Sequence, residues 1–243
     1  SKYIKHDMEY ISILSAIHKS IKKYDIRRMI SFHSRQKWAS DFSGYIKDYN
    51  DVIKGELELD TNHIQGDMPT RLRLEKLAIL KNYQDYDCSI ISNARCLTEG
   101  INVPNLDAVA FVDPKQSAVD IVQAVGRAIR KADSKKFGII FLPLFINLGD
   151  FKKYKKNKID LSNFIKECPG YENTINIIQA LKSHDERLIL QLNELRTKKG
   201  EKPKSTNGSS GLTNFVFDLP TNISLDFTES LVTNLIDATT SSW

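Results

Sequence analysis

Short apolar runs alternate with longer amphipathic segments along the first part of the chain. MISFH (29–33), CSIIS (88–92) and AVAFVD (108–113) are brief and rich in Val, Ile and Phe, which is typical of buried β-strands. FGIIFLPL (137–144) has the same character, and ELDTNHI (58–64) also has the pattern of a strand. The sequence therefore predicts five strands in this region.

A helical repeat follows the first of these strands. In the segment RQKWASDFSGYIKDY, apolar residues recur as on one face of a helix, and we expect four of them to pack in the core: Trp38, Phe42, Tyr45 and Ile46. A platform for stacking nucleic-acid bases is the alternative interpretation of the three aromatic residues. Core packing is the interpretation that the helical spacing favours.

A second helix is expected after ELDTNHI. Gly66 ends the strand, and Pro69 is well suited to the first position of a helix. RLRLEKLAILKNY then offers three leucines for one face: Leu74, Leu77 and Leu80. SAVDIVQAVGRAIR predicts another helix between the last two strands. This repeated order predicts an α/β fold, a mostly parallel sheet flanked by helices, whose ligands gather at the carboxyl ends of the strands.

The pattern changes towards the C-terminal part of the chain. FKKYKKNK (151–158) is a basic run, typical of a solvated surface, with contact to a DNA backbone as the alternative. Apolar residues among charges between Glu172 and Thr197 predict a long surface helix, and residues 198–211 have the composition of a flexible linker. NFVFDL (214–219) and ESLVTNLIDA (229–238) predict a strand and a short helix. We expect three parts: an α/β domain over 1–147, a helical extension over 148–197, and a linker with a small tail segment over 198–243.

Composition narrows the function only a little. The formal net charge of +5 is compatible with an anionic partner without establishing one. The three cysteines lack the spacing of a zinc site or a disulfide framework, so no metal site is expected. The sequence has no signal segment and no long apolar run, and we expect a cytoplasmic protein without a membrane partner.

Four polar or small residues of the segment QAVGRAIR stand three or four positions apart: Gln123, Gly126, Arg127 and Arg130. A helix places residues at this spacing on one face. The guanidinium of arginine has a fixed charge and a planar set of donors that suits phosphate oxygens, and it can stabilise the charge that develops during phosphoryl transfer. For two arginines alone, solvation of an exposed face is the ordinary alternative.

Further blocks of the sequence favour the phosphate interpretation, because together they resemble superfamily 2 helicases and translocases. QAVGRAIR (123–130) resembles their motif VI, and TEGINVP (98–104) resembles motif V. MISFHSR (29–35) is similar to motif IV, and HIQGDMPTRLR (63–73) to the block that follows it. The order is that of the second RecA-like lobe, and the wording is most similar to motor subunits of ATP-dependent restriction systems of type ISP, type I and type III-like. The resemblance implies a RecA-like, P-loop NTPase-type sheet with a C-terminal helical extension.

The resemblance implies roles for residues that match the motifs. Arg127 and Arg130 would be catalytic, as arginine fingers on phosphates held by another lobe. Four residues would contact the nucleotide: Gln123, Gly126, Gly100 and Asn102. Many relatives have Asp in place of Asn102, so a carboxylate contact to ribose is replaced here by an amide, which still forms hydrogen bonds. Five residues would bind the nucleic-acid backbone: Ser34, Arg35, Gly66, Arg71 and Thr98.

The sequence lacks two parts that such a motor needs, a GxxxxGK(S/T) loop for phosphates and an acidic strand end for magnesium. ATP and Mg²⁺ would therefore be held mainly by an upstream RecA-like lobe of the same protein, and this chain by itself is expected to be inactive. Gln123 and Ile129 favour DNA over RNA as the partner. We expect the second motor lobe of a DNA helicase or translocase within a restriction or defence enzyme. An ATPase-inactive binding or regulatory module and an RNA helicase lobe are the alternatives.

Overall fold

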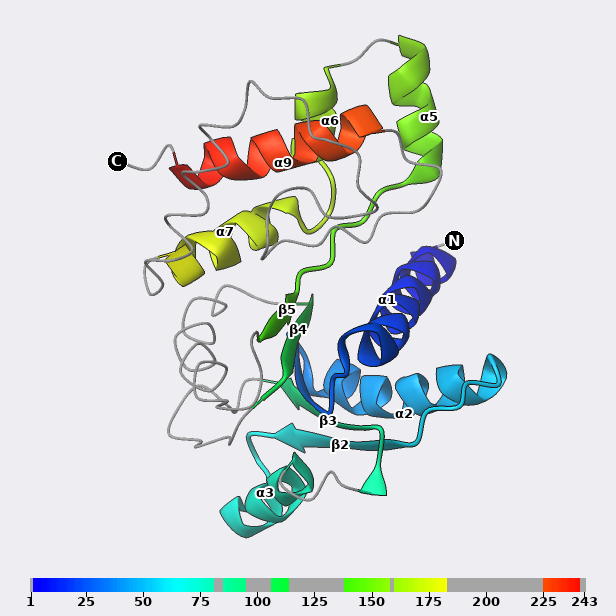
Figure 1. The fold of residues 1–243 in the computed structure, drawn as a ribbon, viewed down its shortest axis with the longest axis vertical. Coiled ribbons are helices and arrows are strands. Elements are labelled where there is room, and N and C mark those ends of the chain that lie inside the picture. The colour runs from blue at the N-terminus through cyan, green and yellow to red at the C-terminus, as the bar shows by residue number, and fades with distance from the viewer. Residues whose placement is uncertain are drawn as a thin grey trace. The chain divides into compact units, whose positions relative to one another are not determined.

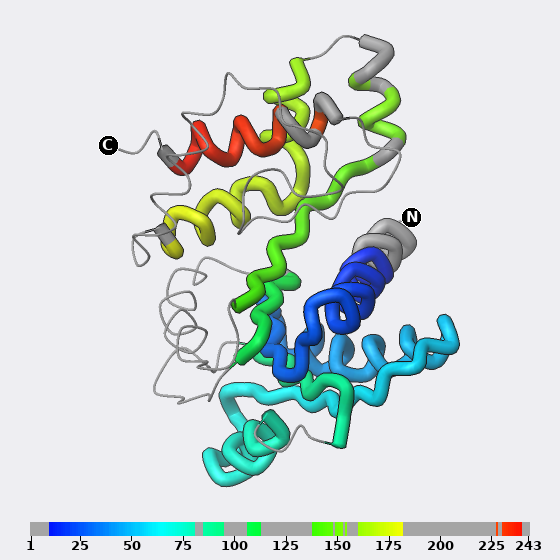
Figure 2. The backbone as a smooth tube through the Cα atoms, viewed as in Figure 1, coloured from blue at the N-terminus to red at the C-terminus, as the bar shows by residue number. Residues whose placement is uncertain are grey.

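The chain divides into two compact units, Ser1–Pro143 and Leu144–Trp243. The computed structural model describes six stretches of the chain, drawn in colour in Figure 1: residues 2–80, 85–94, 106–113, 138–157, 160–182 and 225–240. Figure 2 shows the backbone as a tube in the same view. The first unit holds a β-sheet with helices packed on it, and the described part of the second unit is helical.

Five strands form the sheet of the first unit, and every neighbouring pair is parallel. In chain order they are β1 (Arg28–His33), β2 (Leu59–Gln65), β3 (Cys88–Ala94), β4 (Ala108–Asp113) and β5 (Ile139–Phe141). Their order across the sheet is β2-β3-β1-β4-β5. Every residue of β1 and β3 is buried, as expected for inner strands of a parallel sheet. The predicted α/β fold and its five strands are confirmed.

Helices cover the sheet of the first unit (Figure 1). Helix α2 (Gln36–Val52) packs against β1, β2 and β3, and helix α1 (Lys2–Tyr24) packs on α2. Helix α3 (Thr70–Leu77) follows β2 and continues into the 3₁₀ turn Ala78–Leu80. Sequence analysis assigned no element to the region of α1, although its buried residues have helical spacing: Ile13, Leu14, Ile17 and Ile21.

The predicted core differs from the structure at three positions, and the first is Trp38, which is only half-buried. Phe42 and Ile46 are fully buried, but Tyr45 is 48% exposed, because it lies at the rim of the apolar face of α2 and meets Tyr10 edge to face there. Leu77 is buried, but Leu74 is 61% exposed. The α-helix ends at Leu77 and gives way to a 3₁₀ turn, so a single α-helical repeat does not describe this segment.

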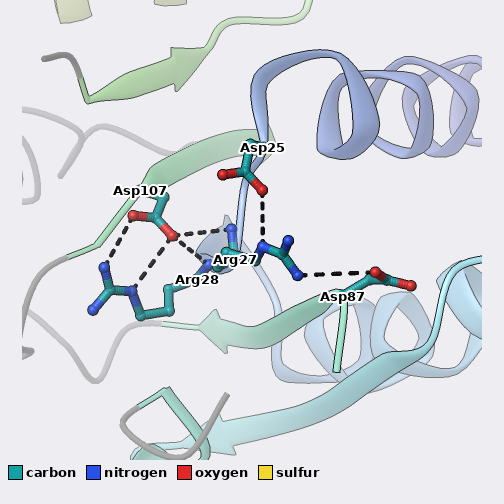
Figure 3. Close-up of polar contacts among 5 residues, drawn as sticks. All are labelled: Asp25, Arg27, Arg28, Asp87 and Asp107. Carbon is teal, nitrogen blue, oxygen red and sulfur yellow. Dashed lines mark hydrogen bonds and ion pairs between the residues drawn. The ribbon is translucent and has the colours of Figure 1, made fainter. Parts of the chain in front are cut away.

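The edge at which the strands begin, here called the amino edge, is held by a buried ion pair (Figure 3). Asp107, directly before β4, is 2% exposed, and one of its carboxylate oxygens lies 3.1 Å from Nη2 of Arg28 at the start of β1. The other oxygen accepts hydrogen bonds from the backbone N–H groups of Arg27 and Arg28 at 2.9 and 2.8 Å. One carboxylate therefore joins the starts of two neighbouring strands and satisfies two backbone donors.

Further contacts close the same edge nearby. Nε of Arg27 lies 2.8 Å from Asp25, and its Nη1 lies 3.9 Å from Asp87 (Figure 3). Asp87 in turn accepts a hydrogen bond of 2.9 Å from the backbone N–H of Glu58, directly before β2. The starts of β1, β2, β3 and β4 are thus linked through carboxylates.

A buried histidine ties α1 to the end of α2 close to the amino edge. Nε2 of His18 lies 2.9 Å from Oδ1 of Asn50, and Nδ2 of Asn50 donates to the carbonyl of Leu57 at 3.1 Å. A Cβ atom on Gly55 would lie 2.2 Å from Oδ1 of Asn50 and 2.8 Å from Nε2 of His18. Glycine is required at this position by the close approach of those side chains.

The second unit contains helices α5 (Leu148–Asn157), α6 (Leu161–Lys166), α7 (Tyr171–Lys182) and α9 (Leu225–Thr240). Phe151, Phe164 and Phe227 join α5, α6 and α9 through ring contacts with centroids 5.5 to 6.4 Å apart. Asn234 of α9 accepts a 2.7 Å hydrogen bond from the hydroxyl of Ser162 and donates to the carbonyl of Ser162 at 3.0 Å. Helix α9 is therefore an integral part of the helical unit.

The described residues include only part of the C-terminal segments for which elements were predicted. The basic run lies in α5 up to Asn157, and its last residue, Lys158, lies outside the described residues. The start of the predicted long helix lies in α7, and its residues after Lys182 also lie outside the described residues. The predicted linker 198–211 and the strand NFVFDL also lie outside them, and the helix predicted over 229–238 lies within α9. None of the helices in the described stretches is both long and apolar enough to cross a lipid bilayer.

Candidate functional site

The edge at which the strands end, here called the carboxyl edge, brings together segments that are distant in the sequence. Phe32 of β1 and Ile64 of β2 both pair with Asn93 of β3. Since the three strands are parallel neighbours, the turn after β1 and the turn after β2 leave the sheet on either side of the end of β3. The predicted nucleic-acid contacts at Arg35 and Gly66 therefore belong to one edge of the sheet.

All of the predicted catalytic and nucleotide contacts, and the predicted nucleic-acid contact Thr98, lie outside the described residues. Thr98, Gly100 and Asn102 belong to the stretch of sequence between β3 and β4. The stretch between β4 and β5 contains the other four: Gln123, Gly126, Arg127 and Arg130. Their predicted roles stay predictions. Both stretches follow strands whose carboxyl ends lie at this edge.

In the turn after β1, Arg35 is exposed to solvent and Ser34 is buried. Ser34 is 4% exposed, whereas Arg35 is exposed and occupies the N-cap position of α2 in an extended conformation (φ −131°, ψ 143°). Its side chain supplies no capping oxygen, and the first intrahelical bond runs from the Ala39 N–H to the Arg35 carbonyl at 3.1 Å. A helix start without an acidic or hydroxyl cap favours an anion, and a cationic side chain beside it adds to that preference. Of the two predicted contacts, Arg35 is the accessible one.

Arg35 and Arg71 differ in their partners. The guanidinium carbon of Arg35 lies 5.0 Å from the ring centroid of Trp38, and Arg35 forms no ion pair with any residue in the described stretches. Arg71 is exposed on α3, and its Nε lies 2.8 Å from Oε1 of Glu75 one turn later. An anion approaching Arg71 has to compete with that carboxylate, whereas Arg35 carries no such competitor within the described part of the chain.

The turn after β2 is exposed and glycine-containing. Gly66 is exposed, and the backbone N–H of Met68 closes the turn on the carbonyl of Gln65 at 3.2 Å. Nζ of Lys76 on α3 donates to the carbonyl of His63 at 3.1 Å and fixes the helix against the strand. Partial burial and then the charge of Lys76 lower the pKa of His63. His63 is therefore mostly uncharged near neutral pH and adds little positive charge to this edge.

Sequence analysis missed a buried polar chain beneath the carboxyl edge. Nε2 of His33, the last residue of β1, lies 3.0 Å from the hydroxyl of Ser31, which donates to the hydroxyl of Ser92 on β3 at 3.1 Å. The His33 ring packs on Phe42 of α2 with centroids 4.9 Å apart. Polar residues alternating in β1 were the available signal, but nothing in the sequence shows that Ser92 pairs with Ser31.

Burial determines the charge state of His33. It lowers the pKa of this imidazole from the ordinary value of 6.5 to about 3. Nδ1 of His33 and the hydroxyl of Ser89 are buried and make no hydrogen bond within the described part of the chain. The hydrogen bond between Ser31 and Ser92 joins the two strands, and the neutral His33 ring that bonds Ser31 is a poor proton donor or acceptor at neutral pH.

Comparison with known proteins gives the family. Residues 11–132, half of the chain, match the family model described as "Helicase conserved C-terminal domain". A relative described as "Probable helicase A859L" of African swine fever virus (isolate Pig/Kenya/KEN-50/1950) is 38% identical over 78 residues, which are 30% of this chain and 9% of the relative. UvrABC system protein B of Enterococcus faecalis (strain ATCC 700802 / V583) is 29% identical over 128 residues, which are 51% of this chain and 17% of the relative.

A solved structure resembles almost the entire chain. It is described as the "ATP-dependent Type ISP restriction-modification enzyme LlaBIII bound to DNA", with 25% sequence identity and a TM-score of 0.72. The match covers 96% of this chain and 15% of that enzyme, so the chain corresponds to a small part of these larger proteins. The matched family region extends from within α1 through strands β1 to β4 to the QAVGRAIR segment, and the chain belongs to the helicase conserved C-terminal domain family, as the C-terminal RecA-like lobe of a superfamily 2 helicase.

Proposed function

We propose that the chain is the second motor lobe of an ATP-dependent DNA helicase or translocase, and that it works with an upstream RecA-like lobe of the same protein. The observation that carries the proposal is the family match over residues 11–132, which spans both the carboxyl edge and the two predicted arginine fingers. The resemblance to an enzyme described as ATP-dependent and bound to DNA supports the choice of nucleotide and partner.

Arg127 and Arg130 supply the catalytic charge in this proposal. Each guanidinium faces phosphate oxygens held by the upstream lobe and stabilises the negative charge that develops during hydrolysis. Gln123 and Gly126 complete the same helix face, and Gly100 and Asn102 approach the nucleotide from the neighbouring segment. All six residues lie outside the described stretches, so their roles rest on the family and on the sequence pattern.

ATP and Mg²⁺ fit this chain only as groups held chiefly by another lobe. Within the described residues, no group of three or more His, Cys, Asp or Glu side chains is placed to hold a metal ion. The sequence also lacks a phosphate-binding GxxxxGK(S/T) loop. ATP supplies the phosphoanhydride whose hydrolysis drives the motor. This chain contributes cationic side chains to it and closes against the upstream lobe in each cycle.

Nucleic acid is the second partner, and the carboxyl edge binds its backbone. Arg35 is exposed there beside an uncapped helix start, Gly66 leaves room for close approach, and Arg71 stands on the neighbouring helix. Thr98 is a further predicted contact, whereas the predicted contact Ser34 is covered and only 4% exposed. Contacts to phosphates fix position and not sequence, which suits a motor that moves along its substrate. The residues of motif VI favour DNA over RNA. The similarity of the motif sequences to those of restriction enzymes favours a restriction or defence enzyme.

The first test is ATP hydrolysis by the full-length protein that carries this lobe, with duplex DNA, single-stranded DNA, RNA or no nucleic acid. DNA should stimulate the wild-type protein most. Arg127→Ala and Arg130→Ala should each lower turnover by about a thousandfold or more with little loss of DNA binding. Lys131→Ala, which removes the next positive charge outside the motif pattern, is the matched control and should retain turnover.

Other outcomes would select other functions. Strongest stimulation by RNA would identify an RNA helicase lobe. Hydrolysis that is absent, or that does not depend on Arg130, would contradict the motor function and favour an ATPase-inactive binding module.

A further inference from the structure

Trp38 has one ring face occupied by the guanidinium of Arg35, 5.0 Å from the ring centroid. Arg35 is the N-cap residue of α2 and Trp38 is the third residue of that helix, so the two side chains lie on the same side of its first turn. The extended conformation of Arg35 (φ −131°, ψ 143°) allows its side chain to lie across the indole. A cation above an indole face is attracted by the negative charge of the ring, and tryptophan gives the strongest such contact.

Trp38 is itself anchored. The hydroxyl of Tyr10 on α1 donates to the carbonyl of Trp38 at 3.1 Å, and the Tyr10 ring meets Phe42 and Tyr45 edge to face at 6.2 and 5.8 Å. Trp38 is half-buried in this arrangement. The helix turn that carries Trp38 is therefore fixed against α1, and a ring on a fixed turn restricts the long side chain that lies on it.

The charge of Arg35 is left available by the same arrangement. No carboxylate in the described stretches pairs with Arg35, in contrast to Arg27, Arg28 and Arg71. A π face holds a guanidinium without neutralising it, and the edge of the guanidinium keeps its N–H donors free for oxygen acceptors. Trp38 therefore orders Arg35 without competing for the anion that Arg35 would bind.

We propose that Trp38 is a positioning residue, which holds the Arg35 guanidinium at the carboxyl edge for contact with a nucleic-acid backbone phosphate. The proposal rests on the proposed function, since it presupposes that nucleic acid binds this edge. Ordering the side chain in advance removes part of the entropy that binding would otherwise cost. Trp38 acts through Arg35, whose guanidinium occupies one face of its ring.

The test is a double-mutant cycle on the full-length protein, with a labelled mixed-sequence DNA duplex as the probe. Trp38→Leu should weaken binding by about two- to fivefold, which is the size expected for a partly exposed cation–π contact. In an Arg35→Ala background, Trp38→Leu should have no further effect. In an Arg71→Ala background, the matched control, the effect of Trp38→Leu should persist, because Arg71 lies on another helix and pairs with Glu75.

Salt dependence separates positioning from charge. Arg35→Ala should lower the slope of log K against log salt concentration by about one, since one phosphate contact is lost. Trp38→Leu should leave that slope unchanged, because the charge at Arg35 remains. Arg35→Lys keeps the charge on an exposed side chain but loses the planar stack, so it should resemble Trp38→Leu in both affinity and slope. This variant keeps the proposal testable if Trp38→Leu does not fold.

Two results would overturn the inference while leaving the proposed function intact. If Trp38→Leu weakens binding equally with and without Arg35, Trp38 contacts the nucleic acid directly. If Arg35→Ala, Arg35→Lys and Trp38→Leu all bind like the wild type while DNA still stimulates ATP hydrolysis through Arg130, the stack is only structural. A wild-type protein that binds neither DNA nor RNA would instead refute the proposed function itself.

Discussion

The two edges of the sheet use arginine in opposite ways. At the amino edge, Arg27 and Arg28 are paired with aspartates, and Asp107 also accepts hydrogen bonds from two backbone N–H groups. At the carboxyl edge, Arg35 is exposed on an indole ring and forms no ion pair within the described residues, beside a helix start that no side chain caps. The same side chain thus closes the structure at one edge and is available to an anion at the other.

This contrast separates charge that stabilises the fold from charge that binds a partner. A buried arginine needs its carboxylate, since an unpaired charge in the interior is costly. An exposed arginine held by an aromatic ring needs no carboxylate and keeps its capacity for phosphate. Net charge alone, at +5, does not distinguish the two cases. Single substitutions can test whether charge at the amino edge stabilises the fold while charge at the carboxyl edge binds a partner.

The largest stability effect is expected from Asp107→Asn at the amino edge. The substitution leaves Arg28 nearly buried and without its carboxylate, which costs about 3–5 kcal/mol of unfolding free energy. Urea unfolding of the chain measures this loss. Asp25→Asn is the matched control, because it removes the same charge from an exposed pair with Arg27 and should cost no more than about 1 kcal/mol. Equal losses in the two variants would show that the buried ion pair stabilises the fold no more than the exposed one does.

An acid-sensitive loss of stability is expected from His33, which lies at the carboxyl edge but belongs to the interior. Its pKa is about 3 in the folded protein against an ordinary value of 6.5, so the unfolded chain binds a proton first as pH falls. Stability contributed by neutral His33 is complete above pH 6.5 and decreases towards the folded pKa, by about 2–3 kcal/mol at pH 4.5.

Comparison with His33→Gln isolates this contribution. The variant should lose the steep part of the decrease in unfolding free energy between about pH 6.5 and 4.5, since glutamine does not titrate. The same pH dependence in both proteins would mean that other groups are responsible.

Gly55→Ala should produce a smaller loss, of about 1–3 kcal/mol in unfolding free energy. Its Cβ atom would lie 2.2 Å from Oδ1 of Asn50, so the hydrogen bond between His18 and Asn50 has to break or shift. Gly44→Ala is the control on the exposed face of α2, where an added Cβ meets nothing within 4 Å. It should stabilise the chain by about 0.5–1 kcal/mol, because alanine favours the helix. Chemical denaturation of both variants measures these changes in unfolding free energy. An unchanged unfolding free energy for Gly55→Ala would contradict the close packing around this glycine.

The sequence was sufficient for the parts of the fold that rest on local patterns. Short apolar runs and the strand pattern of ELDTNHI predicted all five strands, and the motifs predicted a helicase lobe that the family match confirms. The prediction of which α2 residues are buried was right for Phe42 and Ile46 and wrong for Tyr45, because helical spacing gives the apolar face of a helix but not its width.

Contacts between distant residues were beyond the sequence. In the sequence, Asp107 cannot be told from any other loop aspartate. It lies 79 positions from Arg28, and the two residues meet only because strand β4 pairs with β1. The stack between Arg35 and Trp38 is local in sequence, but the hydrogen bond from Tyr10 of α1 to the Trp38 carbonyl joins residues 28 positions apart. Pairings of this kind follow from topology, which single-sequence patterns do not determine.

The most direct test of the contrast is DNA binding by the full-length protein with Arg35→Ala and, separately, Arg27→Ala. Both variants remove one partly or fully exposed arginine from the same unit, at opposite edges of the sheet. We predict that Arg35→Ala weakens binding several-fold and lowers the salt slope by about one, while Arg27→Ala changes neither. Equal effects of the two variants would contradict the account, because binding would then follow total charge and not the carboxyl edge.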